Sequence, residues 1–130
     1  MDKQPLAKYT LALLLAISVL PASAKECLPS MKEGWVRLPP STMPMMAGFG
    51  RITNPCSSPM VIVSASSPAF GEVSLHETRN VDGVNRMREL DQLRIAPDGD
   101  AILKPGGMHL MLMQPRAPLK EGSKVVVSFK

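Results

Sequence analysis

Two histidines and two nearby methionines are the residues of this 130-residue chain with the clearest potential for metal chemistry. Ten residues separate His76 from Met87, and a single residue separates His109 from Met111. A thioether sulfur is a soft, neutral donor that hard cations ignore and zinc rarely uses, whereas Cu(I) accepts both thioether and imidazole ligands. If the fold brings these four side chains together, they would suit Cu(I).

Each of these residues, taken singly, has an ordinary explanation. Methionine often fills gaps in hydrophobic cores, and an isolated histidine is usually only hydrogen-bonded. The chain has only two histidines, however, and both belong to this methionine pattern. The combination therefore favours a metal site over simple packing.

A β-hairpin is predicted around Asp82-Gly83, a residue pair typical of two-residue turns. The turn sets the strand register, which predicts three cross-strand pairs: Val81 with Val84, Thr78 with Met87, and His76 with Glu89. Residues two apart on a strand share a face, and so do residues directly opposite each other. His76 and Met87 are therefore expected as diagonal neighbours on one face.

The segment MHLMLM, residues 108–113, alternates as a half-buried strand does. Its first, third and fifth residues form an ordinary apolar core face. The other face carries one histidine and two methionines, which are His109, Met111 and Met113. We expect Met113, one step farther along the strand, to pack beside the site.

Frequent proline and glycine divide the chain into short segments, and no stretch shows sustained helical periodicity. Strands are predicted at 35–38, 47–53, 61–66, 72–78, 84–90, 93–96, 101–103, 109–113 and 125–129. Many short strands separated by turns are typical of an antiparallel β-sandwich or small barrel. Trp35 is expected in the core, and the proline-containing segment 38–46 is expected to be irregular. Packing is favoured over an accessory copper contact for its three methionines, Met43, Met45 and Met46.

The first 24 residues have the pattern of a secretory signal peptide. Basic residues precede a 12-residue apolar run, Tyr9–Leu20, and the sequence ASA at 22–24 is an A-x-A cleavage site. The run is too short to span a membrane, and the charged residues before Cys27 do not fit a lipoprotein box. We therefore expect a soluble periplasmic product, residues 25–130, with one domain and no membrane anchor.

Charge and cysteine content limit the function further. The formal net charge is +4, only 4% of residues are aromatic, and no run of Lys or Arg exists, so nucleic-acid binding has no support. Cys27 and Cys56, the two cysteines, most simply form one disulfide in an exported protein, with free thiols or metal ligation as alternatives. Their spacing does not match a C-x-x-C redox motif.

A family resemblance adds to this interpretation. The stretch HETRNVDGVNRM…LKPGGMHLML resembles the PCu(A)C family of periplasmic copper chaperones, whose signature is His-x10-Met-x21-His-x-Met, and the similarity runs from about Trp35 to Phe129. The resemblance implies a cupredoxin-like Greek-key β-sandwich or barrel. It also implies delivery of Cu(I) toward the copper-site subunit of cytochrome oxidase or an assembly factor. The implied copper ligands are His76, Met87, His109 and Met111.

Three other functions fit the sequence less well than that of a copper chaperone. An electron-transfer cupredoxin needs a cysteine thiolate beside two histidines and a methionine, and neither cysteine lies in such a motif. A copper-dependent secreted enzyme would favour a site richer in histidine. A metal-free secreted interaction domain would show no stabilisation by metal. We therefore expect a monomeric metallochaperone rather than an enzyme.

Overall fold

The computed structural model describes residues 27–130, so the predicted signal peptide lies outside the described residues. This part of the chain forms ten strands: β1 (Ser30–Arg37), β2 (Met45–Thr53), β3 (Met60–Ile62), β4 (Ala65–Ser66), β5 (Phe70–Val81), β6 (Val84–Glu89), β7 (Leu93–Ile95), β8 (Asp100–Leu103), β9 (Met108–Pro115) and β10 (Ser128–Phe129). Within residues 27–130, no helix has the length and apolar character needed to cross a membrane.

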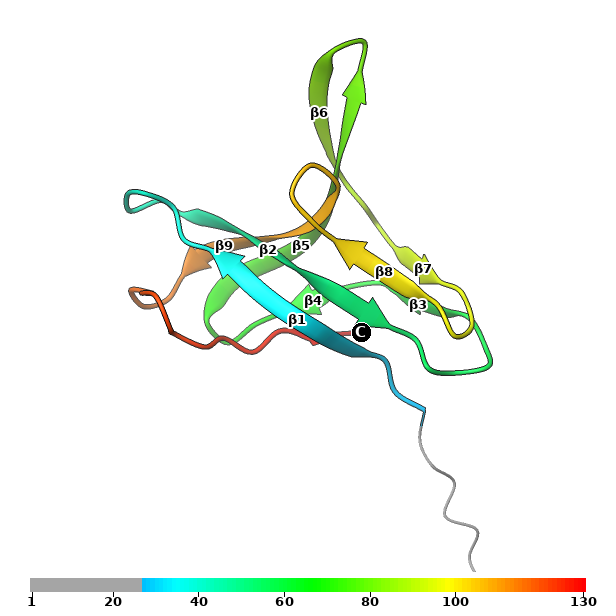
Figure 1. The fold of residues 1–130 in the computed structure, drawn as a ribbon. Helices are drawn as coiled ribbons and strands as arrows, with labels where there is room; N and C mark the ends of the chain where they lie inside the picture. The colour runs from blue at the N-terminus through cyan, green and yellow to red at the C-terminus, as the bar shows by residue number, and fades with distance from the viewer. Residues whose placement is uncertain (1–26) are drawn as a thin grey trace, which may run out of the picture.

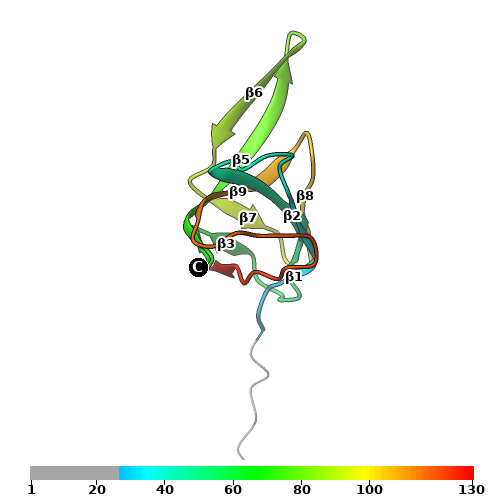
Figure 2. The ribbon, with the colours of Figure 1, turned by 90° about the vertical axis from the view of Figure 1, so that its left-hand side faces the viewer.

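Eight of the strands form one large, curled sheet (Figures 1 and 2). Its order is β1-β2-β8-β9-β5-β4-β10, with β6 paired to β5, and β2 also pairs with β9. The pairings are antiparallel except for that of β8 with β9, and β3 and β7 form a separate small sheet. Both views show the β5–β6 hairpin extending beyond the rest of the molecule as an arm.

The alternation predicted for MHLMLM is present in β9, and its even-numbered leucines belong to the core. Leu110 and Leu112 of β9 are only 2% and 0% exposed, and they pack with buried residues of other strands, including Ile52, Phe70 and Leu103. Burying one such leucine contributes about 1.5–3 kcal/mol to stability. The odd-numbered residues of β9 therefore lie on the opposite side of the sheet, which we call the outer face.

The N-terminal segment is joined to the body of the protein by a disulfide between Cys27 and Cys56, with a Cα–Cα distance of 5.5 Å. The predicted disulfide is thus confirmed. Cys56 is itself held by Asn54, which is 1% exposed and accepts a hydrogen bond of 3.0 Å from the Cys56 backbone N–H. The Asn54 amide also donates to the backbone carbonyls of Ser58, Ile95 and Ala96.

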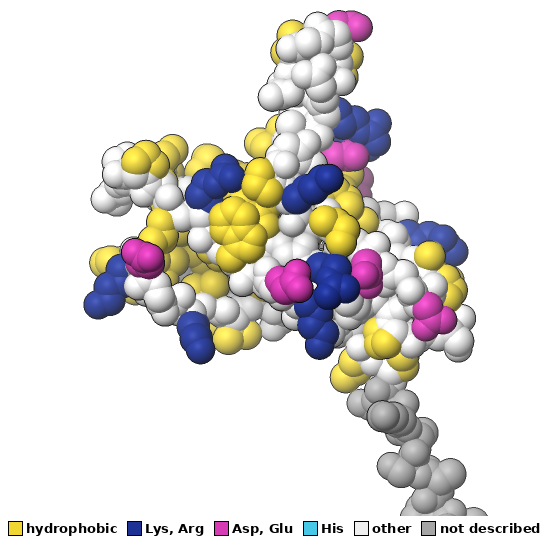
Figure 3. Space-filling model, viewed as in Figure 1, with side chains coloured by type: hydrophobic (Ala, Val, Ile, Leu, Met, Phe, Trp, Pro, Cys, Tyr) yellow, Lys and Arg dark blue, Asp and Glu magenta, His cyan; other side chains and the backbone are white. Residues whose placement is uncertain are grey.

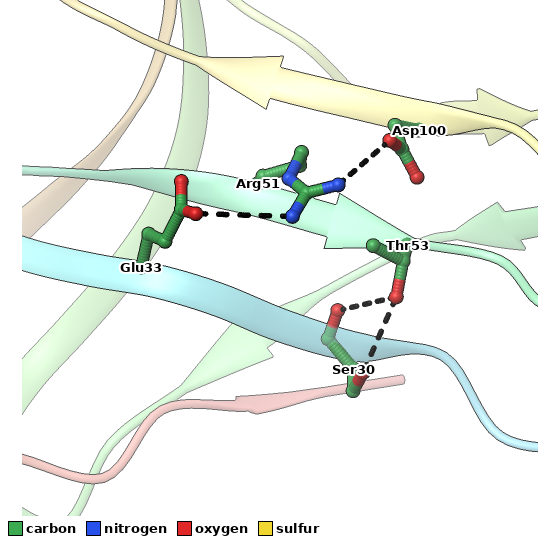
Figure 4. A network of polar contacts seen from close by, with 5 residues as sticks. All are labelled: Ser30, Glu33, Arg51, Thr53 and Asp100. Atoms are coloured by element: carbon green, nitrogen blue, oxygen red, sulfur yellow. Dashed lines mark hydrogen bonds and ion pairs between the residues drawn. The ribbon is translucent and has the colours of Figure 1, made fainter.

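Exposed polar contacts connect β1, β2 and β8 near one end of the sheet (Figure 4). Arg51 donates to Asp100 over 3.2 Å and lies 3.9 Å from Glu33, while the hydroxyls of Ser30 and Thr53 are 3.2 Å apart. Exposed ion pairs contribute at most about 1 kcal/mol each, so the core supplies most of the stability.

Several predicted strands differ in their bounds from the observed ones; β1, for example, begins at Ser30 rather than at Trp35. The predicted strand 61–66 is two strands, because the chain leaves the small sheet after Ile62 and joins the large sheet at Ala65. The predicted strand 125–129 forms a ladder only at 128–129, although alternate residues from Val125 onward pack against the core. The irregular segment 38–46 ends earlier than predicted, because Met45 already belongs to β2.

Trp35 is not a core residue. Its side chain is 48% exposed and stacks on Phe49, with ring centroids 4.6 Å apart. Val36, the next residue of β1, packs against the core instead. The Arg37 guanidinium lies 5.8 Å from the centroid of the Trp35 ring. Figure 3 shows hydrophobic side chains flanked by basic ones on the face in view.

Candidate metal centre

The β5–β6 hairpin has the predicted register. Val81 pairs with Val84, Thr78 with Met87, and His76 with Glu89. Asp82 and Gly83 both have positive φ, 52° and 81°, as a two-residue hairpin turn of this type requires. The local turn chemistry therefore places Met87 diagonally across from His76, on the same face of the hairpin.

Pairing of β5 with β9 brings in the second half of the site. His76 lies directly opposite His109, and their rings are stacked with centroids 6.0 Å apart. Ser74 lies directly opposite Met111 in the same ladder. Because His76 and Ser74 share a face, as do His109 and Met111, all four predicted residues belong to one patch of the outer face.

A backbone carbonyl selects the tautomer that His109 adopts when its ring is neutral. Its Nδ1 lies 3.0 Å from the carbonyl oxygen of Gly107, which can only accept a hydrogen bond, so Nδ1 carries the proton. In neutral His109, Nε2 then keeps its lone pair, and Nε2 lies 3.2 Å from the sulfur of Met87. A thioether has no hydrogen to donate, so two electron-pair donors face each other without a proton between them.

This separation fits two ligands of one metal ion. At bond lengths of about 2.0 Å to nitrogen and about 2.3 Å to sulfur, as in zinc sites, two donors on one ion lie roughly 3–3.5 Å apart. The distance between His109 Nε2 and Met87 Sδ falls in this interval. The donor chemistry, imidazole with thioether, suits a soft monovalent ion such as Cu(I).

His76 offers a second free nitrogen. Its Nε2 lies 2.9 Å from the Ser74 hydroxyl, whereas its Nδ1 is buried and has no hydrogen-bond partner among the described residues. A buried polar atom without a partner is costly, and a bound ion would satisfy it. Burial lowers the pKa of His76 below its ordinary value of 6.5. His109 lowers that pKa further, whereas Glu89 and Glu72 raise it in part. The neutral form that can bind metal is therefore favoured.

The two methionines differ in their access to solvent. Met87 is 55% exposed on the projecting hairpin, whereas Met111 is half-buried within the sheet. His109 is 7% exposed, and His76 is half-buried. The two imidazoles are therefore less accessible to solvent than the Met87 side chain.

Among residues 27–130, no group of three or more His, Cys, Asp or Glu side chains is arranged to hold a metal. Cys27 and Cys56, the two cysteines of the sequence, are joined to each other. A blue-copper site requires a cysteine thiolate, so this disulfide-bonded protein has no ligand set of the electron-transfer type.

A family model described as "Putative lipoprotein LpqE-like" matches residues 30–130. The chain belongs to the LpqE-like family. A "Putative lipoprotein" of Leifsonia xyli subsp. xyli is 36% identical over 101 residues, which is 77% of this chain and 60% of that protein. An uncharacterized protein of Rickettsia prowazekii is 33% identical over 69 residues, 52% of this chain and 38% of that protein. The chain therefore spans less than two thirds of the curated relatives it matches.

Solved structures with the same fold include two PCuAC domains. The apo domain from PmoF1 superposes with a TM-score of 0.57 and 17% identity, covering 80% of this LpqE-like chain and 92% of the domain. The copper-bound domain from PmoF2 gives a TM-score of 0.56 and 15% identity, covering 78% and 88%. The predicted all-β, cupredoxin-like class and the resemblance to PCu(A)C domains are thus confirmed at the level of the fold.

Several residues of the LpqE-like site were not predicted. Ser74 contacts His76, and its position two residues earlier on the same strand face was the available signal. Phe49 is 3% exposed and lies 6.4 Å from the His109 ring, between that ring and Trp35. Arg37 covers the two aromatic rings, 5.2 Å from Phe49. Phe49 of β2 therefore lies beside His109, and Trp35 and Arg37 of β1 cover Phe49 in turn.

Proposed function

We propose that this LpqE-like protein is a copper carrier that binds one Cu(I) through His76, Met87, His109 and Met111. The observation that carries the proposal is the 3.2 Å approach of His109 Nε2 to Met87 Sδ, because a neutral imidazole with its proton on Nδ1 and a thioether both offer electron pairs there. The unpartnered Nδ1 of His76 supports it. The copper-bound state of a PmoF2 domain with the same fold adds further support.

The ligand set suits transport rather than catalysis. Imidazole and thioether are neutral donors, and methionine sulfur binds Cu(I) without the strong charge attraction of a thiolate. Unlike thiols, thioethers are not lost to disulfides in an oxidising compartment. Exposed Met87 gives an acceptor protein access to the ion. We therefore propose a metallochaperone and not an enzyme.

The acceptor and the compartment belong to the same proposal. Residues 1–24 have the pattern of a signal peptide, so the functional form is residues 25–130 in the periplasm. The name "lipoprotein" given to a relative agrees with export. We propose that the protein acts as a monomer and delivers Cu(I) to the copper-site subunit of cytochrome oxidase or to an assembly factor.

An anaerobic Cu(I) titration of the processed protein against a calibrated chelator tests this function. One Cu(I) per chain should bind tightly. Only neutral imidazole can ligate, so affinity should be flat above neutral pH and should fall on acidification. Because burial lowers the pKa of His76, the loss at this residue should begin below its ordinary value of 6.5. With two histidine ligands, the limiting loss is roughly tenfold to a hundredfold per pH unit.

Two outcomes would contradict the proposal. An affinity that stays constant down to about pH 5 would mean that the histidines do not bind the ion. An affinity still rising steeply between about pH 8 and pH 9 would indicate a thiolate ligand, which requires opening of the disulfide. The chelator's own protonation must be corrected at each pH.

A further inference from the structure

A second group of sulfur donors lies on the outer face, next to the proposed site. Met45 of β2 pairs directly with Met113 of β9, and Met113 pairs on its other side with Glu72 of β5. The residues of the opposite parity are buried: Met46, Leu112 and Val73 are 9%, 0% and 8% exposed. Met45, Met113 and Glu72 therefore form one cross-strand row on the outer face, which we call the methionine row.

The spacing within the methionine row allows a shared ion. Directly opposite residues of antiparallel strands have Cβ atoms about 4.5–5.5 Å apart, so two flexible thioethers can reach the same atom. The contact between the two strands continues one residue past Met45 and Met113, because the Gln114 N–H donates to the Pro44 carbonyl over 2.7 Å. The row thus lies on a fixed ladder rather than on a loose segment.

The methionine row adjoins the proposed copper site. Met113 follows Met111 by two positions on β9, a step of about 6.8 Å along a strand. Glu72 likewise precedes Ser74 by two positions on β5. Arg37, on neighbouring β1, is directed to the aromatic rings of Trp35 and Phe49, at 5.8 and 5.2 Å.

The side chains of the methionine row are accessible to solvent. Met45 is 42% exposed, and Met113 is half-buried beside it. An ion in solvent can therefore reach the sulfur atoms. The thioethers would select a soft ion, and the Glu72 carboxylate would offset a single positive charge. The row has no imidazole, so its affinity should be lower than that of the histidine-containing site.

We propose that Met45, Met113 and Glu72 form a second, weaker site for a soft monovalent ion, Cu(I) or Ag(I), through which copper reaches or leaves the main site. This inference rests on the proposed function only for its role in transfer. Binding of the ion at the row is a separate property and can be tested separately.

The test is an Ag(I) titration of the processed protein with methyl-13C methionine, followed by NMR. The first equivalent should shift the methyl signals of Met87 and Met111, and the second should shift those of Met45 and Met113. In the double variant Met45→Leu/Met113→Leu, which conserves side-chain volume, the second affinity should fall at least about tenfold and the first should stay within about twofold.

Met43→Leu is the matched control, because Met43 is as exposed as Met45, at 43% against 42%, but lies outside the strand pairing. It should leave both affinities unchanged. The inference is overturned if the second equivalent shifts no methionine signal, or if it shifts Met43 as much as Met45. A first equivalent that leaves Met87 and Met111 unshifted would contradict the main site instead, whatever happens at the row.

Discussion

Replacing Met87 with leucine is expected to weaken Cu(I) binding by at least about a hundredfold, because even indirect contacts to metal ligands are worth about 10–100-fold. Leucine keeps the volume and apolar character of methionine but removes the sulfur that lies 3.2 Å from His109 Nε2. The side chain is 55% exposed, so the free energy of unfolding should change by less than about 0.5 kcal/mol. Competition with a chelator measures the affinity, and chemical denaturation measures the stability.

Met60→Leu provides the matched control, because it makes the same chemical change in β3 of the small sheet. Its Cu(I) affinity should equal that of the unaltered protein. Equal affinities for the Met87 and Met60 variants would show that Met87 is not a ligand. The assignment of His76, His109 and Met111 would then need a different fourth donor.

The second large effect is expected from loss of the disulfide. The Cys27→Ser/Cys56→Ser variant should lose about 3 kcal/mol of unfolding free energy, because a loop of this length restricts the unfolded chain by roughly 3–4 kcal/mol. The two cysteines are 29 residues apart in sequence. For a domain of this size, the melting temperature should fall by roughly 10–20 °C.

Loss of the disulfide should lower the stability without changing the Cu(I) affinity. Neither cysteine belongs to the proposed ligand set, so the folded double-serine variant should retain the affinity of the unaltered protein. The reduced form of the unaltered protein should match the variant in stability. An unchanged unfolding free energy would contradict the stabilising role of the disulfide, and a lost copper affinity would contradict the ligand assignment.

The hairpin and its two potential ligands could be predicted because their geometry is local. Asp82 and Gly83 adopt the positive φ angles that their residue types favour, and this fixes the register that relates His76 to Met87. The alternation of 108–113 likewise follows from the two-residue period of a strand, since Leu110 and Leu112 are buried and His109 lies on the other face.

The meeting of the two halves could not be predicted from local pattern. Which residue of β5 lies opposite His109 depends on long-range packing of β5 against β9, and shifts of two residues would preserve the same alternation. Only the family signature linked the two halves in the sequence, and the structure shows that His109 lies opposite His76. The methionine row is equally non-local, because Met45 and Met113 are 68 positions apart in sequence.

Trp35 illustrates why an aromatic residue in a short strand is ambiguous. In the segment WVRL, Trp35 shares a face with Arg37, whereas Val36 belongs to the other face. The prediction placed Trp35 in the core, but Val36 packs there and Trp35 covers Phe49 on the outer face. The arginine two residues later was the signal for the exposed side.

X-ray absorption spectroscopy of the processed protein loaded with one equivalent of Cu(I) tests the central claim most directly. The proposed ligands, His76, Met87, His109 and Met111, predict a three- or four-coordinate ion with both nitrogen and sulfur neighbours, about two of each. The Met87→Leu variant should lose about one sulfur neighbour. A first coordination shell made only of nitrogen or oxygen atoms would contradict the assignment of a mixed histidine–methionine copper site.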